Sequence, residues 1–155
     1  MPTPSSHREP PQPLHLTLVV RRSIRAPAER LFDAWTQAEH LTQWWGPKGV
    51  HCPHAEVDLR VGGRYRIGNQ FADGTLVWIS GEFEHIARPF ELIYTWLIEP
   101  ATDAPERVMV RFIEADGSTQ VIVTHERIAD EAKRAEHEQG WFGCLDGLVE
   151  YVAPV

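Results

Sequence analysis

The chain has 155 residues, of which 43% are hydrophobic and 24% charged, and its formal net charge is −7. This length suits one domain with a sizeable core, and the composition is that of an ordinary globular protein. The apolar stretches are far shorter than the roughly 20 residues of a membrane-spanning helix, so we expect no transmembrane helix and no stable membrane association. The acidic balance argues against nucleic-acid binding, which needs a clustered positive surface.

The N-terminal segment differs in composition from the rest of the chain. Residues 1–13 are rich in proline and polar residues and lack the apolar stretch of a secretory signal, which predicts a disordered tail. We expect a single domain over residues 14–155. Cys52 and Cys144 lie far apart without a CxxC partner, which favours a reducing compartment, so cytoplasm is the expected localisation.

The first predicted elements are a strand and two short helices. Residues 14–24 are rich in Leu, Val and Thr and predict a strand. Pro27 suits the first turn of a helix, and an amphipathic pattern follows over residues 28–36. A second helical segment, residues 38–46, stops at Gly46-Pro47.

Alternation of apolar and polar residues then predicts six more strands before a long helix. The strands cover residues 50–59, 64–71, 76–86, 91–98, 108–113 and 121–125. In the third of these, both faces carry apolar side chains, so which face points inward stays open. After residue 128 the period becomes helical and continues to 152. This order predicts an α+β fold with an antiparallel sheet and excludes a doubly wound parallel one.

Several segments of the chain resemble a known family. They are WWGP at 44–47, DLRVGGRYR at 58–66, Thr124-His125, and HEQGWFGCLDGLVEYV from His137. Together they are similar to the activator of heat-shock-90 ATPase homologue (AHSA) group of the START-like, or SRPBCC, superfamily. The resemblance implies a helix-grip (Bet v 1-like) fold, a seven-stranded curved sheet around a C-terminal helix with a cavity open to apolar ligands. The superfamily includes carriers, cyclases and co-chaperone domains, so the activity has to be argued from the pocket.

The tryptophans and one histidine are the main candidates for that pocket. Six tryptophans are a heavy aromatic load, which suits both a core and a ligand site, and we favour Trp45 and Trp141 as ligand contacts. His125 shares strand parity with Val123 and should face the helix that carries His137 and Trp141. Burial would keep His125 neutral, either as a catalytic acid/base candidate or as a structural histidine bonded locally.

The residues that could contribute to a metal site are His51, Cys52, His54, His125 and His137. The HCPH segment lacks the usual ligand spacing, and a strand sends neighbouring residues to opposite faces. We therefore expect no metal and no cofactor.

The sequence thus predicts a protein that binds an apolar or amphipathic, lipid-like small molecule in an internal hydrophobic pocket, as a monomer or homodimer. One alternative is a polyketide cyclase- or hydrolase-like enzyme that uses His125 as acid/base, with Glu82 or Tyr65 assisting. The other is a co-chaperone-like interaction domain. The expected ligand-binding residues are Trp45, Tyr65, Trp78, Phe83, Trp96, Val110, Phe112, Val123, His125, His137, Trp141 and Leu145.

Overall fold

The computed structural model describes residues 15–101 and 104–153. The tail predicted over residues 1–13 lies outside the described residues. The strands are β1 (Leu16–Ile24), β2 (His51–Val57), β3 (Arg64–Gln70), β4 (Leu76–Ala87), β5 (Glu91–Ile98), β6 (Glu106–Ala115) and β7 (Ser118–Ile128). The helices are α1 (Ala28–Thr36), α2 (Ala38–Trp44) and α3 (Glu131–Val152).

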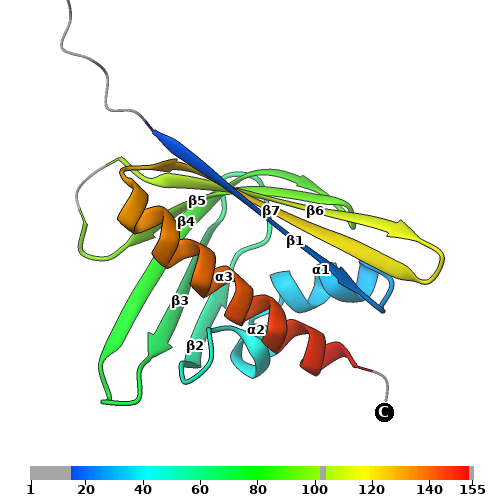
Figure 1. The fold of residues 1–155 in the computed structure, drawn as a ribbon, viewed down its shortest axis with the longest axis horizontal. Helices are drawn as coiled ribbons and strands as arrows, with labels where there is room; N and C mark the ends of the chain where they lie inside the picture. Colours follow the sequence, from blue (N-terminus) through cyan, green and yellow to red (C-terminus); the bar gives the residue numbers. More distant parts are fainter. Residues whose placement is uncertain (1–14, 102–103, 154–155) are drawn as a thin grey trace, which may run out of the picture.

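The strands form one antiparallel sheet in the order β1-β7-β6-β5-β4-β3-β2. The sheet is strongly curved, and α3 runs diagonally across one of its faces (Figure 1). The helices α1 and α2 lie near the C-terminal end of α3 (Figure 1). The predicted fold class, a helix-grip arrangement of seven strands around a long C-terminal helix, is confirmed.

Local sequence signals explain where the helices begin and which face they bury. The chain enters α1 through Pro27, which has no N–H to leave unpaired at a helix start. The helix α3 begins at Asp130, whose carboxylate accepts a hydrogen bond from the Lys133 backbone N–H. The buried residues of α3 recur at helical spacing and lie on the face toward the sheet: Trp141, Cys144, Leu145, Leu148 and Val152.

The inward face of β4, which the sequence left open, is set by Ile79 and Phe83, both buried. Trp78 therefore lies on the opposite, outer face of the sheet. There its ring stacks against that of His54, and the Arg66 guanidinium lies 3.8 Å from its centroid. The outer face thus has its own aromatic cluster, separate from the core.

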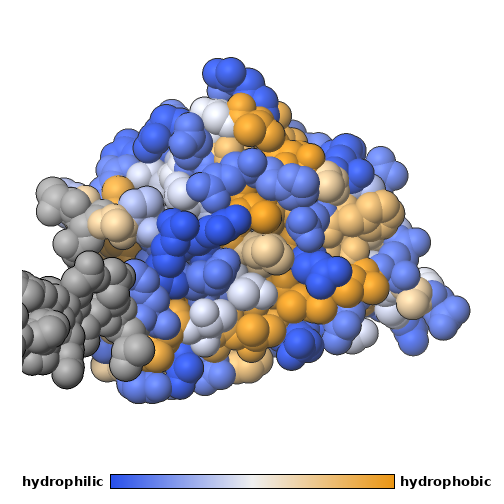
Figure 2. Space-filling view, turned by 90° about the horizontal axis from the view of Figure 1, so that it is seen from above, coloured by the Kyte–Doolittle hydropathy of each residue, from blue (hydrophilic) through white to orange (hydrophobic). Residues whose placement is uncertain are grey.

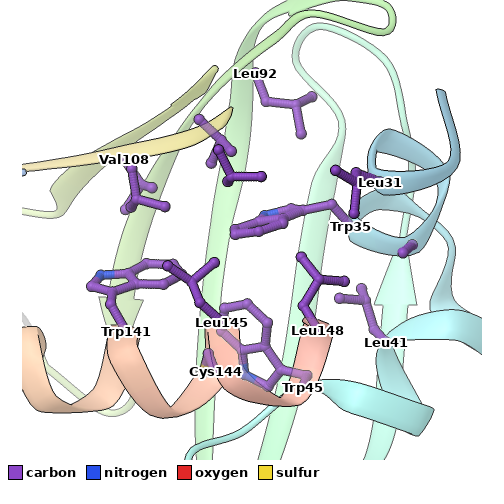
Figure 3. Packing of buried hydrophobic residues seen from close by; sticks show 14 of the residues in the cluster. Leu31, Trp35, Leu41, Trp45, Leu92, Val108, Trp141, Cys144, Leu145 and Leu148 are labelled. Atoms are coloured by element: carbon purple, nitrogen blue, oxygen red, sulfur yellow. The ribbon is translucent and has the colours of Figure 1, made fainter. Parts of the chain in front are cut away.

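Aromatic rings fill most of the space between the sheet and α3. The ring of Trp35 lies at the centre of this region (Figure 3), stacked on Trp141 with centroids 5.9 Å apart and planes 16° apart. The indole N–H of Trp35 donates to the Tyr94 hydroxyl at 3.2 Å. The cavity left beside Trp35 measures only about 20 Å³, which is room for a water molecule.

The surface carries scattered apolar residues, as most protein surfaces do. On the face shown in Figure 2, apolar side chains lie in several areas separated by hydrophilic ones. None of the helices among the described residues combines the length and the apolar character needed to cross a bilayer.

Candidate ligand-binding groove

A groove opens at the edge of the core, between α3 and the strands β3, β4 and β5. Its volume is about 160 Å³. The residues that line it come mainly from these four elements and are largely apolar: Trp45, Pro47, Asn69, Phe71, Val77, Ile79, Trp96, Ile98, Glu136, His137, Gly140, Trp141 and Cys144. The groove therefore has an apolar wall with a few polar groups, as small-molecule sites do.

Three tryptophans form the inner wall of the groove. The ring of Trp45 meets that of Trp141 edge-on at 5.6 Å, and Trp96 lies 6.2 Å from Trp45 and 5.7 Å from Trp141. Figure 3 shows Trp45 and Trp141 close to α3, on the side of the core away from Leu92. Because each ring packs on the other two, the wall is rigid and presents large apolar surfaces to the groove.

On the helix side, the groove is left open by a glycine. A Cβ atom at Gly140 would have no heavy atom within 4 Å. Gly140 lies one turn after His137 and directly before Trp141, and all three residues line the groove, so the missing side chain at 140 leaves this side of the groove open. No packing contact requires glycine at position 140, but the groove stays open on this side because residue 140 has no side chain.

Behind this wall lies a cluster of hydrogen-bonded side chains around His125. The indole N–H of Trp141 donates to His125 Nδ1 at 3.0 Å, and His125 Nε2 lies 2.7 Å from Glu106 Oε1. An indole N–H can only donate, so Nδ1 must be the unprotonated nitrogen of the imidazole. His125 Nε2 therefore carries the proton and donates a hydrogen bond to the Glu106 carboxylate.

His137 completes the cluster from α3. Its ring stacks on that of His125 with centroids 4.3 Å apart, and its Nε2 lies 3.0 Å from Glu106 Oε1 without the alignment of a hydrogen bond. The His125 side chain is fully buried, whereas 13% of the His137 side chain is exposed. His137 is thus the histidine that borders the groove.

The cluster shifts the pKa values of two of its members. Burial disfavours the charged imidazole and lowers the pKa of His125 below its usual 6.5, although the hydrogen bond to Glu106 acts in the opposite direction. Burial alone would raise the pKa of the Glu106 carboxyl, but the hydrogen bond from His125 and the nearby His137 outweigh it and lower that pKa to about 2. Near neutral pH the cluster therefore holds a neutral His125 beside a carboxylate.

Glu106, His125 and His137 also bring three candidate metal-ligand atoms within 4.8 Å of one another. Two imidazoles and a carboxylate can hold a transition metal. A ligating nitrogen must be unprotonated, however, and the His125 nitrogen facing Glu106 carries a proton because Trp141 occupies the other one. The three residues fit a hydrogen-bonded cluster better than a metal centre.

The remaining residues considered for a metal do not converge on this cluster. His51 is exposed and Cys52 is buried. His54 packs against Trp78 on the outer face of the sheet.

A second hollow, of about 380 Å³, adjoins the groove at Trp96, Ile98 and His137. It is lined by residues from the ends of β5, β6 and β7 and from the start of α3, including Glu106. The carboxylate of the buried cluster therefore borders this second hollow, while Trp141 and Trp45 border the first.

The structure brings only some of the predicted ligand-binding residues together. Those that line the groove are Trp45, Trp96, His137 and Trp141. Tyr65 and Phe83 border the small internal cavity. The core, away from either space, contains Val110, Phe112, Val123 and Leu145. His125 lies behind the wall, and Trp78 lies on the outer face.

Two residues of the candidate site, Asn69 and Glu106, are not among those that the sequence predicts. The sequence predicts that the sixth strand begins at residue 108, but Glu106 opens this strand, β6, and pairs in register with Trp96. The signal was present, because Glu106 has the same strand parity as Val108 and Val110, and Asn69 has that of Ile67.

The sequence matches the family model of the Activator of Hsp90 ATPase homolog 1-like proteins over residues 25–153. The chain belongs to the AHSA1 family. A search of curated proteins finds no match.

Solved structures share the AHSA1 fold along nearly the whole chain. A protein from Chromobacterium violaceum is 25% identical with a TM-score of 0.82, and the alignment covers 90% of this chain and 98% of that one. The AHSA1 protein from Silicibacter pomeroyi is 28% identical with a TM-score of 0.79, covering 89% and 98%. A protein from Nitrosomonas europaea has 24% identity and a TM-score of 0.75, covering 88% and 93%.

Proposed function

We propose that this AHSA1-family protein binds a small, largely apolar molecule in the groove between α3 and strands β3–β5. The observation that carries the proposal is the groove itself, an apolar hollow of about 160 Å³ walled by three tryptophans. An apolar cavity of about 150 Å³ is large enough to bind benzene in an engineered protein. The groove is therefore large enough for a single aromatic ring.

The volumes favour the groove over the centre of the core. The sequence led us to expect a ligand enclosed between the sheet and the helix. The cavity there measures about 20 Å³ because Trp35 and its neighbours occupy the space. A ligand at the edge, in contact with Trp45, Trp96 and Trp141, requires no rearrangement of those rings.

The environment of His125 supports binding over acid/base catalysis by that residue. Both of its ring nitrogens are engaged, one by Trp141 and the other by Glu106. A proton-transferring side chain must come within hydrogen-bond reach of the substrate atom. His125 lies behind Trp141 and has neither a vacant nitrogen nor exposed surface.

The proposal is tested by filling the groove from its helix side. We expect Gly140→Leu to retain the fold, because a Cβ there meets no atom within 4 Å, and to place its side chain where the ligand would lie. p-Xylene should perturb the indole N–H resonances of the groove tryptophans in wild-type protein, and the replacement should weaken that binding at least tenfold.

Gln139→Leu is the matched control, since residue 139 lies on the same helix, is exposed and does not line the groove. It should bind p-xylene as the wild type does. Equal binding by wild type and Gly140→Leu, or no binding by the wild type, would refute the proposal.

A further inference from the structure

The second hollow, of about 380 Å³, differs in charge from the rest of the protein. The charged side chains that line it belong to Arg127, Lys133 and Glu106, so the hollow is basic on balance in a chain whose net charge is −7. Glu106 is already engaged by a hydrogen bond from His125. Among the described residues, neither Arg127 nor Lys133 takes part in an ion pair. The hollow therefore presents two cationic side chains that no carboxylate of the described residues neutralises.

Arg127 reaches the hollow through a strained backbone conformation. Strand β7 has one more residue than β1 between the pairs Leu16–Ile128 and Leu18–His125, so it bulges at Arg127, whose φ is 66°. Glycine adopts this left-handed conformation without strain, whereas arginine does not. The bulge keeps Ile128 in the core and turns the neighbouring arginine into the hollow. Strain that is retained at one position is a recognised mark of a functional residue, and here it aims a cation.

The hollow and the groove adjoin, and their charges differ in sign. Trp96, Ile98 and His137 line both spaces. The charged residue that lines the groove is Glu136, which would repel an anion. An anionic group is therefore favoured in the hollow and an apolar group in the groove, so the two spaces together would orient a molecule that carries both.

We propose that the hollow binds the carboxylate of an arylalkyl carboxylic acid through Arg127, while the aromatic ring of the same molecule lies in the groove. The inference rests on the proposed function, because it names the class of ligand that the groove takes. A guanidinium group donates paired hydrogen bonds that match the two oxygens of a carboxylate. Lys133 contributes a second positive charge on the same side. The tryptophan wall offers ring faces and edges to the aromatic part.

The experiment compares 4-phenylbutyrate with 4-phenyl-1-butanol, which share a carbon skeleton and differ by a carboxylate in place of a neutral alcohol. Arg127→Gly removes the guanidinium and relieves the positive φ, so the variant should fold at least as stably as the wild type. We expect it to weaken 4-phenylbutyrate binding by roughly three- to tenfold, the worth of a partly exposed charged hydrogen bond. Binding of 4-phenyl-1-butanol should change less than twofold. Equal weakening of the two ligands, or unchanged binding of 4-phenylbutyrate, would overturn the assignment.

Two variants serve as matched controls. Asp116 is the other non-glycine residue with a positive φ among the described residues, and it lines neither space, so Asp116→Gly controls for the relief of backbone strain. Arg25 is exposed and also lines neither space, so Arg25→Gln controls for the loss of one positive charge. Both should leave the ratio of the two affinities unchanged. A fall in that ratio as large as in Arg127→Gly would contradict a specific contact with Arg127.

A second measurement needs no variant. Salt screens an ion pair at a partly exposed site, so raising the ionic strength should weaken 4-phenylbutyrate binding relative to that of 4-phenyl-1-butanol. An affinity ratio that does not change with salt would contradict the ion pair.

The failures of the two proposals are distinguishable. If Gly140→Leu leaves the affinities for p-xylene and for both phenylalkyl ligands unchanged, the groove is not the ligand site and both proposals fail. If Gly140→Leu weakens all three ligands but Arg127→Gly does not discriminate between the acid and the alcohol, the proposed function stands and the carboxylic acid is the wrong class.

Discussion

The indole of Trp141 determines the protonation of the buried histidine behind it. Because its N–H donates to His125 Nδ1, the imidazole is held as one neutral tautomer with its proton toward Glu106. Protonation of His125 would place a second hydrogen opposite the indole N–H and would charge a side chain with no exposed surface. The hydrogen bond and the burial therefore favour the same state.

This arrangement predicts that His125 destabilises the fold on acidification. The unfolded chain takes up a proton at His125 near pH 6.5, whereas the folded protein does so only at lower pH. Stability contributed by the neutral histidine is thus present above pH 6.5 and falls below it. We expect the urea midpoint to fall between pH 7.5 and 5, and to fall less steeply in His125→Gln. Because the two proteins differ only at residue 125, parallel curves would show that His125 is not held neutral.

At the residue scale, the sequence predicted the tryptophans that line the groove better than the polar side chains beside them. His125 facing Trp141 followed from strand parity together with the helical stripe of α3. Glu106 and Asn69 did not, because the end of a strand and the inward direction of a polar side chain are set by pairing with neighbouring strands. Whether a buried N–H is paired depends on distances of a few tenths of an ångström, which no sequence pattern encodes.

The approach of α3 to the segment after α2 depends on two glycines, four residues apart. A Cβ at Gly143 would lie 2.9 Å from the Pro47 Cα, and one at Gly147 would lie 2.9 Å from the Trp44 carbonyl oxygen. These glycines allow the backbone that carries Trp45 to lie directly on the helix. They thereby place one wall residue of the groove against another, Trp141.

Two alanine replacements in α3 should have opposite effects for this reason. Gly140→Ala adds a methyl group in open space and should raise the free energy of unfolding by about 0.5–1 kcal/mol, the gain in helix propensity. Gly143→Ala gains the same propensity but forces Pro47 away, so we expect a net loss of about 1–3 kcal/mol. Urea unfolding of the two variants provides the comparison. A stabilising Gly143→Ala would show that the contact at Pro47 is loose.

At the element scale, turn residues and hydrophobic periodicity were sufficient to predict the order of strands and helices along the chain. The hairpin between β6 and β7 turns at Asp116-Gly117, both with positive φ, as the Asp-Gly pair indicates. The direction of Trp78 could not be predicted, because β4 carries apolar residues on both faces. On its outer face the apolar ring is covered by Arg66 and His54, so hydrophobicity alone does not identify the inward face.

For the whole molecule, the curvature of the sheet and the size of the side chains together determine where space remains. The family resemblance implied a cavity under α3, but the fold leaves its volume to the residues that fill it. Here Trp35 and Trp141 stack at the centre of the core, so open volume remains toward its edges, in the groove beside β3, β4 and β5 and in the hollow at the ends of β5, β6 and β7. The same fold with smaller residues at these positions would enclose a larger internal space.

A ligand in this groove should stabilise the whole domain, because it binds the folded state only. At ten times its Kd, p-xylene should add about 1.4 kcal/mol to the free energy of unfolding. For a domain of about 150 residues this corresponds to a rise in Tm of about 3–6 °C, measured by circular dichroism. Gly140→Leu, whose groove is filled, should show no rise at the same concentration. An apolar solute that binds the unfolded chain would lower the Tm of both proteins alike. A rise in Tm of the wild type alone would therefore attribute the stabilisation to the groove. Equal shifts in Tm in the two proteins would show that p-xylene does not act through the groove.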